Sequence, residues 1–301
     1  MALPPLRLSS GDPLADRRAA YADGLAAGGD PAAAADLMAQ ALDMAPRWTA
    51  AWFRLGEWRS AAGDTAGAVA AWDRVLALDP DDALGAALRI ALTRDVPDLD
   101  AMPPAFVRNL YDAYAPGFEA SLVGALSYRG PQMLLDAVAA RGPFDRVLDL
   151  GCGTGLMGVA IRPHARWLDG CDLSPAMLRE ATAKRVYDRL WEQDIAQMPV
   201  ADAPYDLILA ADVFIYLGAL DPIIMWAAAS LAPQGMLAFT VEALSDGDFR
   251  LQPSSRYAHA AAYLVRVLTA AGLVPQLTPA TLRQDRGEPV ESIIVTAARA
   301  G

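Results

Sequence analysis

Three glycines at alternate positions, Gly151, Gly153 and Gly155, follow an apolar run that contains one acid, Asp149. Glycine adopts backbone angles closed to other residues, and it has no Cβ to obstruct a ligand lying across the turn. A carboxylate beside such a turn repels a pyrophosphate and attracts a cationic ammonium or sulfonium group. The sequence therefore predicts a turn that accepts a flat or polar ligand carrying positive charge.

A dinucleotide site is the first alternative for a glycine turn of this kind. Its fingerprint requires a third glycine at the position that Leu156 occupies. A nicotinamide dehydrogenase would also need a hydride-transfer group such as Tyr-x-x-x-Lys, and none is evident. The spacing therefore disfavours NAD.

The glycine turn lies in a region where apolar runs alternate with helical patterns. Strands separated by helices of about 10 to 15 residues indicate βαβ units, and thus a mostly parallel sheet with helices on both faces. Ligands of such sheets bind beyond the carboxyl ends of the strands. We expect strands near 146–150, 167–172, 189–193, 205–211, 235–241, 273–278 and 291–298, and helices within 106–140 and near 154–163, 175–185, 218–232 and 258–271.

The segment from Asp149 to Gly155 resembles motif I, DxGxGxG, of the class I S-adenosylmethionine-dependent methyltransferases. The resemblance covers residues 106–301 and implies a Rossmann-like α/β domain with a seven-stranded sheet. It implies S-adenosylmethionine as methyl donor and S-adenosylhomocysteine as product. Asp172 stands 21 residues beyond Gly151, where the family's acid accepts from both ribose hydroxyls. Asp194 matches the acid that accepts from the adenine amino group.

Further cofactor contacts follow from the same resemblance. Leu173 and Met177 would wall the adenine, with Ile195 stacking on it, and the segment YDLILAADVFIYL (205–217) matches the fourth strand and the loop below the methyl group. The residues expected to bind the cofactor are Tyr111, Tyr114, Asp149, Gly151, Cys152, Gly153, Asp172, Leu173, Met177, Asp194, Ile195 and Ala211.

Tyr111 and Tyr114 lie in LYDAYAPGFEASL (110–122), which resembles the lid before motif I in small-molecule methyltransferases. The two tyrosines stand about one helical turn apart, on one face. They would close over the methionine end of the cofactor. The alternative is that they belong to a packed helix between two domains.

The catalytic residues are harder to predict, because an activated methyl group needs alignment and exclusion of water rather than a fixed triad. We expect His259 to be the base, since it follows the fifth strand, and Tyr111 and Tyr216 to assist. A buried or capping role is the alternative for His259. The segment ADVF (211–214) disfavours methylation of exocyclic base amines, which uses Asn or Asp followed by Pro-Pro-Tyr there.

Three residues are expected to bind the substrate. Arg256 and Tyr257 precede His259 at the mouth of the predicted sheet, and Arg129 could anchor a carboxylate or a phosphate. No metal site is expected, because Cys152 and Cys171 are the only cysteines and two thiols do not make a zinc site.

The amino-terminal third contains a repeat. Residues 14–46 and 48–80 superimpose at a shift of 34 residues. The second copy resembles a tetratricopeptide repeat, with the family's residue types at Trp52, Leu55, Gly56, Ala68, Trp72 and Pro80. Since two repeats rarely bury enough surface alone, a helix within 82–95 would cap them. We expect a helical repeat domain over 1–95, a proline-rich linker over 96–105 and the methyltransferase domain over 106–301.

Composition limits the partners. The formal net charge is −11 over 301 residues, which argues against nucleic acid because that partner needs a basic surface. Without an apparent leader or an uncharged apolar run of about 18 residues, the chain is expected to be cytoplasmic and to have no membrane partner. The repeats suggest a docked protein or carrier, or an accessory domain. The competing functions are methylation of a small-molecule or carrier-bound acceptor, methylation of a protein recruited by the repeats, and a non-catalytic scaffold that binds the cofactor.

Overall fold

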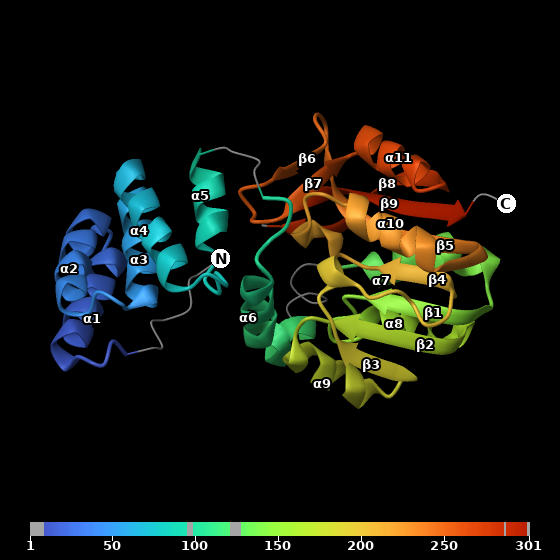
Figure 1. Ribbon diagram of the computed structural model, residues 1–301, viewed down its shortest axis with the longest axis horizontal. Coiled ribbons are helices and arrows are strands. Elements are labelled where there is room, and N and C mark those ends of the chain that lie inside the picture. The colour runs from blue at the N-terminus through green and yellow to red at the C-terminus, as the bar shows by residue number, and fades with distance from the viewer. Residues whose placement is uncertain (1–8, 95–98, 121–127, 286, 300–301) are drawn as a thin grey trace. The chain divides into compact units, whose positions relative to one another are not determined.

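The computed structural model describes residues 9–94, 99–120, 128–285 and 287–299. Two compact units divide the chain between residues 98 and 99. The first unit is helical, and the second is built around one large sheet (Figure 1).

The first unit is a series of short helices, two of which, α2 (Pro31–Met44) and α4 (Thr65–Leu78), begin in the same way. Asp30 and Asp64, which stand 34 residues apart, accept hydrogen bonds at the starts of α2 and α4 from the backbone N–H groups of Ala33 and Gly67. Such caps satisfy N–H groups that a helix leaves unpaired. The repeat seen in the sequence therefore has a structural counterpart. The helices are α1 (Pro13–Ala27), α2 (Pro31–Met44), α3 (Thr49–Ala61), α4 (Thr65–Leu78) and α5 (Ala86–Arg94).

Small residues allow α3 and α4 to approach closely. A Cβ on Gly56 would overlap the indole of Trp72, which is buried against it. The Trp72 Nε1–H donates to the backbone oxygen of Phe53 at 3.3 Å. The glycine is therefore needed for the Trp72 ring to lie flat against the backbone of α3.

We expect Gly56→Ala to destabilise the first unit by about 1–3 kcal/mol, because the added methyl forces Trp72 out of a packed core. Gly24→Ala is the matched control, since Gly24 is an exposed helical glycine whose Cβ would meet nothing within 4 Å. That change should stabilise by roughly 0.5–1 kcal/mol. Urea unfolding followed by helical circular dichroism checks both values, and equal stability of the two variants would contradict the packing described.

The second unit contains a mixed sheet of nine strands in the order β3-β2-β1-β4-β5-β7-β6, with β9 pairing with both β5 and β8. The strands β1 to β5 and β7 pair in parallel, whereas β6, β8 and β9 join antiparallel. Their bounds are β1 (Phe144–Leu150), β2 (Ala165–Asp172), β3 (Arg189–Glu192), β4 (Tyr205–Ala210), β5 (Leu231–Leu244), β6 (Phe249–Leu251), β7 (Tyr257–Ala260), β8 (Leu273–Asp285) and β9 (Glu288–Arg299).

The prediction of seven strands was wrong, because the described sheet has nine. The two additional strands are the short β6 and β7. Residues 258–260 had been assigned to a helix, but they form β7, and the helix begins at Ala261. A strand of four buried residues next to a helix has no period that separates the two. The remaining seven strands follow the predicted order.

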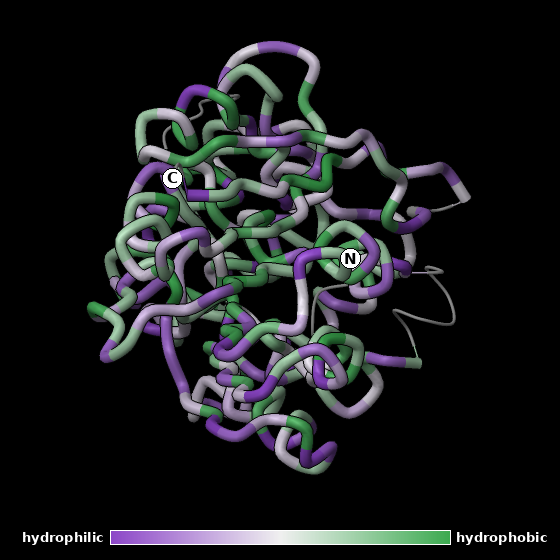
Figure 2. The backbone as a smooth tube through the Cα atoms, turned by 90° about the vertical axis from the view of Figure 1, so that its right-hand side faces the viewer, coloured by the Kyte–Doolittle hydropathy of each residue, from purple (hydrophilic) through white to green (hydrophobic). Residues whose placement is uncertain are grey.

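Alternating residues of the central strands face two hydrophobic cores. Leu148 packs on the side covered by α10 and α11, whereas Val147 packs on the side covered by α7 and α8. Figure 2 shows hydrophobic and hydrophilic residues interspersed along the helices, as expected of helices with one buried face. The helices of this unit are α6 (Pro104–Tyr114), α7 (Gly130–Val138), α8 (Leu156–Ile161), α9 (Pro175–Lys184), α10 (Asp221–Ser230) and α11 (Ala261–Ala270).

Of the predicted linker over 96–105, residues 96–98 lie outside the described residues. Residues 99–105 belong to the second unit, where the N–H of Met102 donates to the oxygen of Tyr216 at 3.0 Å and Ala101 forms a β-bridge with Leu217. Met102 is buried. The burial of this apolar side chain holds the segment on the second unit despite the prolines that suggest a linker. In the predicted lid, 121–122 lie outside the described residues.

No helix in the described part of the chain combines the length and the apolar character that crossing a membrane requires.

Candidate active site

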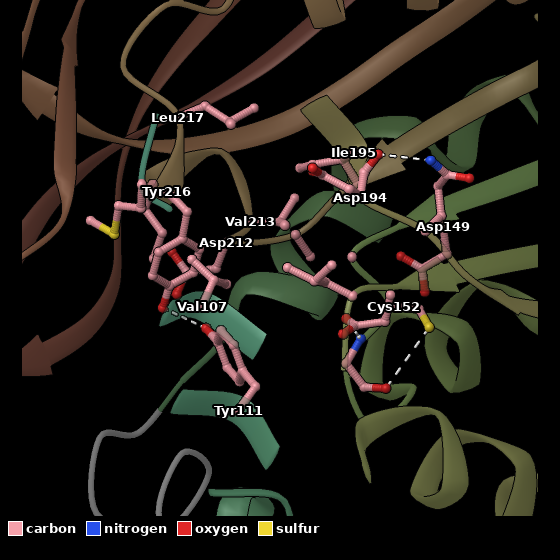
Figure 3. A pocket seen from close by; sticks show the side chains of 18 of the residues that line it. Val107, Tyr111, Asp149, Cys152, Asp194, Ile195, Asp212, Val213, Tyr216 and Leu217 are labelled. Atoms are coloured by element: carbon pink, nitrogen blue, oxygen red, sulfur yellow. Dashed lines mark hydrogen bonds between the residues drawn. The ribbon is translucent and has the colours of Figure 1, made fainter. Parts of the chain in front are cut away.

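A cavity of about 380 Å³ opens beyond the carboxyl ends of β1, β2 and β4 (Figure 3). This volume falls within the range of about 300–1,000 Å³ typical of small-molecule sites. The cavity brings together most of the residues predicted from the sequence. Those that line it are Tyr111, Asp149, Gly151, Cys152, Gly153, Asp172, Leu173, Asp194, Ile195, Ala211, Tyr216 and Arg256.

The glycine turn has the backbone that its sequence predicts. Gly151, Gly153 and Gly155 all have positive φ, at 61°, 54° and 92°. A Cβ on Gly151 would overlap Val213, whereas a Cβ on Gly153 would stand in open space. Gly151 is therefore required for packing below the turn, and Gly153 leaves room for a ligand above it.

Asp149 is fully buried at the end of β1. Its Oδ2 accepts from the Tyr187 hydroxyl at 2.6 Å, and its Oδ1 has no hydrogen-bond partner within the described ranges. Burial raises the pKa of this carboxyl to about 7, against the lowering effect of the Tyr187 hydrogen bond. An unpaired buried acceptor is costly unless a ligand satisfies it.

Asp172 is held by two backbone N–H groups. Its Oδ2 accepts from Gly153 at 2.9 Å and its Oδ1 from Ser174 at 2.8 Å. Burial raises the pKa of Asp172 above its ordinary value. Each carboxylate oxygen has a second lone pair, so this side chain can accept further hydrogen bonds from a ligand in the cavity.

Asp194 lines the cavity next to Ile195 (Figure 3). Its Oδ1 accepts from the N–H of Ala196 at 2.9 Å, and its Oδ2 accepts from Gln197 Nε2 at 3.3 Å. The three acids thus come from the ends of three consecutive parallel strands, as the sequence predicts.

Helix α6 contributes one wall through Tyr111. The Tyr111 and Tyr216 hydroxyls lie 2.5 Å apart, with the two rings edge to face (Figure 3). Burial raises the pKa of both phenols. On the same helix, Asp112 Oδ1 accepts from Ser174 Oγ at 2.5 Å and from the N–H of Ala176 at 3.2 Å. These contacts fasten α6 to the loops after β2 and β4.

A buried ion cluster supports the far end of the cavity, and sequence reasoning missed it. Arg283 donates to both oxygens of Asp212, at 2.8 and 2.7 Å, and also to Glu242. Asp212 lines the cavity and has a φ of 59°. The three residues come from β8, the β4 loop and β5, so no local pattern in the sequence could have joined them.

Five predicted residues do not line the cavity. Met177 is buried beside Ala115 and Ala176, Tyr114 is 43% exposed, and Arg129 is exposed at the start of α7. Tyr257 donates its hydroxyl to the oxygen of Leu99 at 2.7 Å. The fifth is His259.

The prediction that His259 is a base does not fit its position. His259 is fully buried on β7, and its Nε2 lies 2.9 and 3.0 Å from the backbone oxygens of Leu217 and Gly218. Burial lowers its pKa to about 4. His259 therefore joins β7 to the loop that follows β4. This is the buried role that the sequence leaves open as the alternative to a base.

Several apolar residues of the cavity wall were also missed. They come from the segment predicted to be a linker, from α6 and from the turn after β4, where apolar character alone does not separate a cavity wall from a core. They include Met102, Pro103, Pro104, Val107, Val213, Ile215 and Leu217.

Comparison with known proteins finds similarity over part of this chain, including the acidic residues of the site. Residues 147–235 match the model of a family described as a methyltransferase domain. Methyltransferase-like protein 27 of Homo sapiens is 34% identical over 128 residues, which are 40% of this chain and 50% of that protein. Malonyl-[acyl-carrier protein] O-methyltransferase of Enterobacter lignolyticus is 35% identical over 108 residues, 35% of this chain and 43% of that protein. The chain thus spans about half the length of the curated relatives it matches.

A solved structure supports the fold. The crystal structure of magnesium protoporphyrin IX methyltransferase from Synechocystis with bound SAH has a TM-score of 0.50 and 18% identity, over 65% of this chain and 99% of that one. The second unit therefore has the Rossmann-like class I methyltransferase fold, with a mixed sheet and helices. The matched domain includes Asp149, Asp172 and Asp194.

We expect Asp149→Asn to raise the melting temperature at pH 8 by roughly 3 °C or more. Between its ordinary pKa of 3.8 and about 7, the folded protein holds a proton on Asp149 that the unfolded chain has lost. Stability therefore falls as the pH rises through this window and stays low above it. Asparagine is neutral and can still accept from Tyr187, so its advantage should shrink towards pH 5. Calorimetric melts from pH 5 to 8 measure it.

Asp169→Asn is the control for that measurement. Asp169 is equally buried, but it is paired with Arg146 at 2.9 Å and accepts from the Tyr205 hydroxyl at 3.0 Å. Its substitution should lower the melting temperature throughout the range. The assignment for Asp149 is wrong should its asparagine variant melt below the wild type at pH 8.

Proposed function

We propose that this protein is an S-adenosylmethionine-dependent methyltransferase that acts on a small-molecule or carrier-bound acceptor. The observation that carries the proposal is the meeting of Asp149, Asp172 and Asp194 with the glycine turn in one cavity. The names of the relatives and the SAH-bound structure of similar fold support it.

The residues of the cavity fit this cofactor. Asp149 Oδ1 is an unpaired buried acceptor that suits a cationic group, and Asp172 is oriented by Gly153 and Ser174 to accept from paired hydroxyls. Asp194 would accept from the adenine amino group beside Ile195. The open space at Gly153 leaves the turn free for close contact with the ligand.

The bound cofactor supplies a methyl group already activated by its sulfonium. The protein's own part is to orient the acceptor and to exclude water, which lowers the barrier by placing the reacting atoms in contact. Tyr111 and Tyr216, joined through their hydroxyls, close one side of the cavity. They are positioned to orient an acceptor rather than to remove its proton, because burial raises the pKa of both phenols.

The first unit bears on the second candidate, a protein methyltransferase recruited through its helices. We infer that these helices are tetratricopeptide-like, since the 34-residue shift relates the Asp30 and Asp64 caps, and Gly56 packs on Trp72 as small residues do between paired helices. A non-catalytic scaffold is the third candidate. Methyl transfer is favoured over it because the acidic residues and the glycine turn are all present.

We expect Asp172→Ala and Gly153→Val each to weaken S-adenosylmethionine binding at least tenfold. The first change removes charge-assisted hydrogen bonds, and the second places a branched side chain in the cavity at a positive φ. Titration calorimetry measures both affinities. Asp145→Ala serves as control, since Asp145 is 83% exposed and pairs only weakly with Arg166, at 3.8 Å. Wild-type affinity in both cavity variants would remove the site assignment.

We expect residues 99–301 alone to bind S-adenosylhomocysteine within about threefold of the full chain, a difference of roughly 0.7 kcal/mol. Every described residue that lines the cavity lies between 101 and 256, within the second unit. Calorimetry on the fragment and the full chain tests this expectation. A folded fragment that fails to bind would show that residues 1–98 are needed for the site.

A further inference from the structure

Arg256 is the arginine of the cavity lining, and its guanidinium forms no ion pair with a described residue. Its side chain lines the cavity, and within the described ranges it makes no hydrogen bond or ion pair. Its backbone is fixed, because the Arg256 oxygen accepts from the N–H of Gln252 at 2.8 Å. Its charge lowers the pKa of Tyr216 against the raising effect of burial, and both residues line the same cavity.

The other charges at this end are already paired. Arg283 is held by both oxygens of Asp212 and by Glu242. Burial raises the pKa of Glu242, against the lowering effect of the charges of Arg283 and Arg256. Arg256 therefore remains available for an anion that enters the cavity.

The tyrosine pair adds a hydrogen-bond donor. One of the Tyr111 and Tyr216 hydroxyls donates to the other across 2.5 Å, so the accepting hydroxyl keeps its own hydrogen for a ligand. A guanidinium and a hydroxyl on one wall form a pair of donors, and a carboxylate is the anion that accepts from such pairs.

The acids Asp149, Asp172 and Asp194 are assigned to the cofactor, and no other described group on the cavity wall is free to remove a proton from an acceptor. Burial raises the pKa of Tyr111, Tyr216 and the Cys152 thiol, Asp212 is engaged by Arg283, and His259 is buried away from the cavity. This favours a nucleophile that is already ionised at neutral pH. A carboxylic acid meets that condition with a pKa near 4, whereas a thiol, with a pKa of about 8.5, stays mostly protonated.

The wall around Tyr216 is apolar. It is formed by Met102, Pro103, Pro104, Val107, Ile215 and Leu217. Such a wall gains free energy by covering hydrocarbon and offers nothing to a polar body. The acceptor should therefore have an apolar body that ends in the anion.

We propose that the acceptor is a carboxylic acid with an apolar body, bound through its carboxylate by Arg256 and the tyrosine pair, and methylated on a carboxylate oxygen. This rests on the proposed methyltransferase function. A lone pair of that oxygen forms the new O–CH₃ bond while the S–CH₃ bond breaks and its electrons pass to sulfur. No proton moves. A carboxylate and a sulfonium become a neutral ester and a neutral thioether, so the product loses its attraction to Arg256.

The 301-residue chain is given S-adenosylmethionine with a labelled methyl group and three acids: octanoate, 3-phenylpropionate and indole-3-acetate. Each acid is tested beside the primary amine and the alcohol of the same skeleton. We expect label on at least one acid, released as methanol by mild alkali as methyl esters are, and at least tenfold less on the matched amine and alcohol. Label predominantly on the amine or the alcohol, or no label on any acid from a protein that binds S-adenosylhomocysteine, overturns the proposal.

Variants of Arg256 test its role. We expect Arg256→Gln to lower kcat/KM for the acid at least tenfold, mainly through KM, and Arg256→Lys to lower it less because the charge is retained. Arg250→Gln is the matched control, since Arg250 is an exposed arginine on β6 that does not line the cavity. Equal kcat/KM in Arg256→Gln and Arg250→Gln would overturn the assignment.

Calorimetry with S-adenosylhomocysteine separates this proposal from the one beneath it. We expect the same affinity in the wild type and all three variants. A wild-type protein that does not bind this ligand overturns the proposed function itself, and the acceptor assignment with it.

Discussion

The hydrogen bond from the Gly153 N–H to Asp172 is the contact on which the site depends. It joins the turn after β1 to the end of β2, so that two acids from different strands face one cavity. Gly153 makes this bond with a positive φ of 54°, which glycine adopts without strain. The acids after β1, β2 and β3 then take their places because parallel strands end at the same edge of the sheet.

The electrostatics of the cavity divide along its length. At the glycine turn, Asp149 and Asp172 are buried acids whose pKa values are raised by desolvation, and this end favours a ligand with positive charge. At the other end, Arg256 lines the cavity together with Tyr111 and Tyr216, and Asp212 is paired with Arg283. The cavity can thus hold a positively charged methyl donor at one end and a negatively charged methyl acceptor at the other end.

The sequence predicted those parts of the site that depend on short spacing. Gly151 to Gly155, Asp172 and Asp194 follow strands whose order along the chain implies their neighbours. It failed where contacts join distant segments: Met102 packs against the loop of Tyr216, and Arg283 reaches Asp212 from β8. His259 misled because a histidine after a strand looks the same in sequence whether its side chain faces a cavity or, as here, the backbone oxygens of Leu217 and Gly218.

Asp112 joins α6 to the start of α9. Its carboxylate accepts from Ser174 Oγ and from the N–H of Ala176, and so it caps the first turn of α9 from another helix. Ser174 also donates its own N–H to Asp172. Removal of α6 would therefore take away Asp112, the acceptor of the Ser174 hydroxyl. Ser174 lies two residues after Asp172, the acid assigned to the ribose. By the reciprocity of linked equilibria, a nucleoside that stabilises the loop around Asp172 and Ser174 must also stabilise the position of α6.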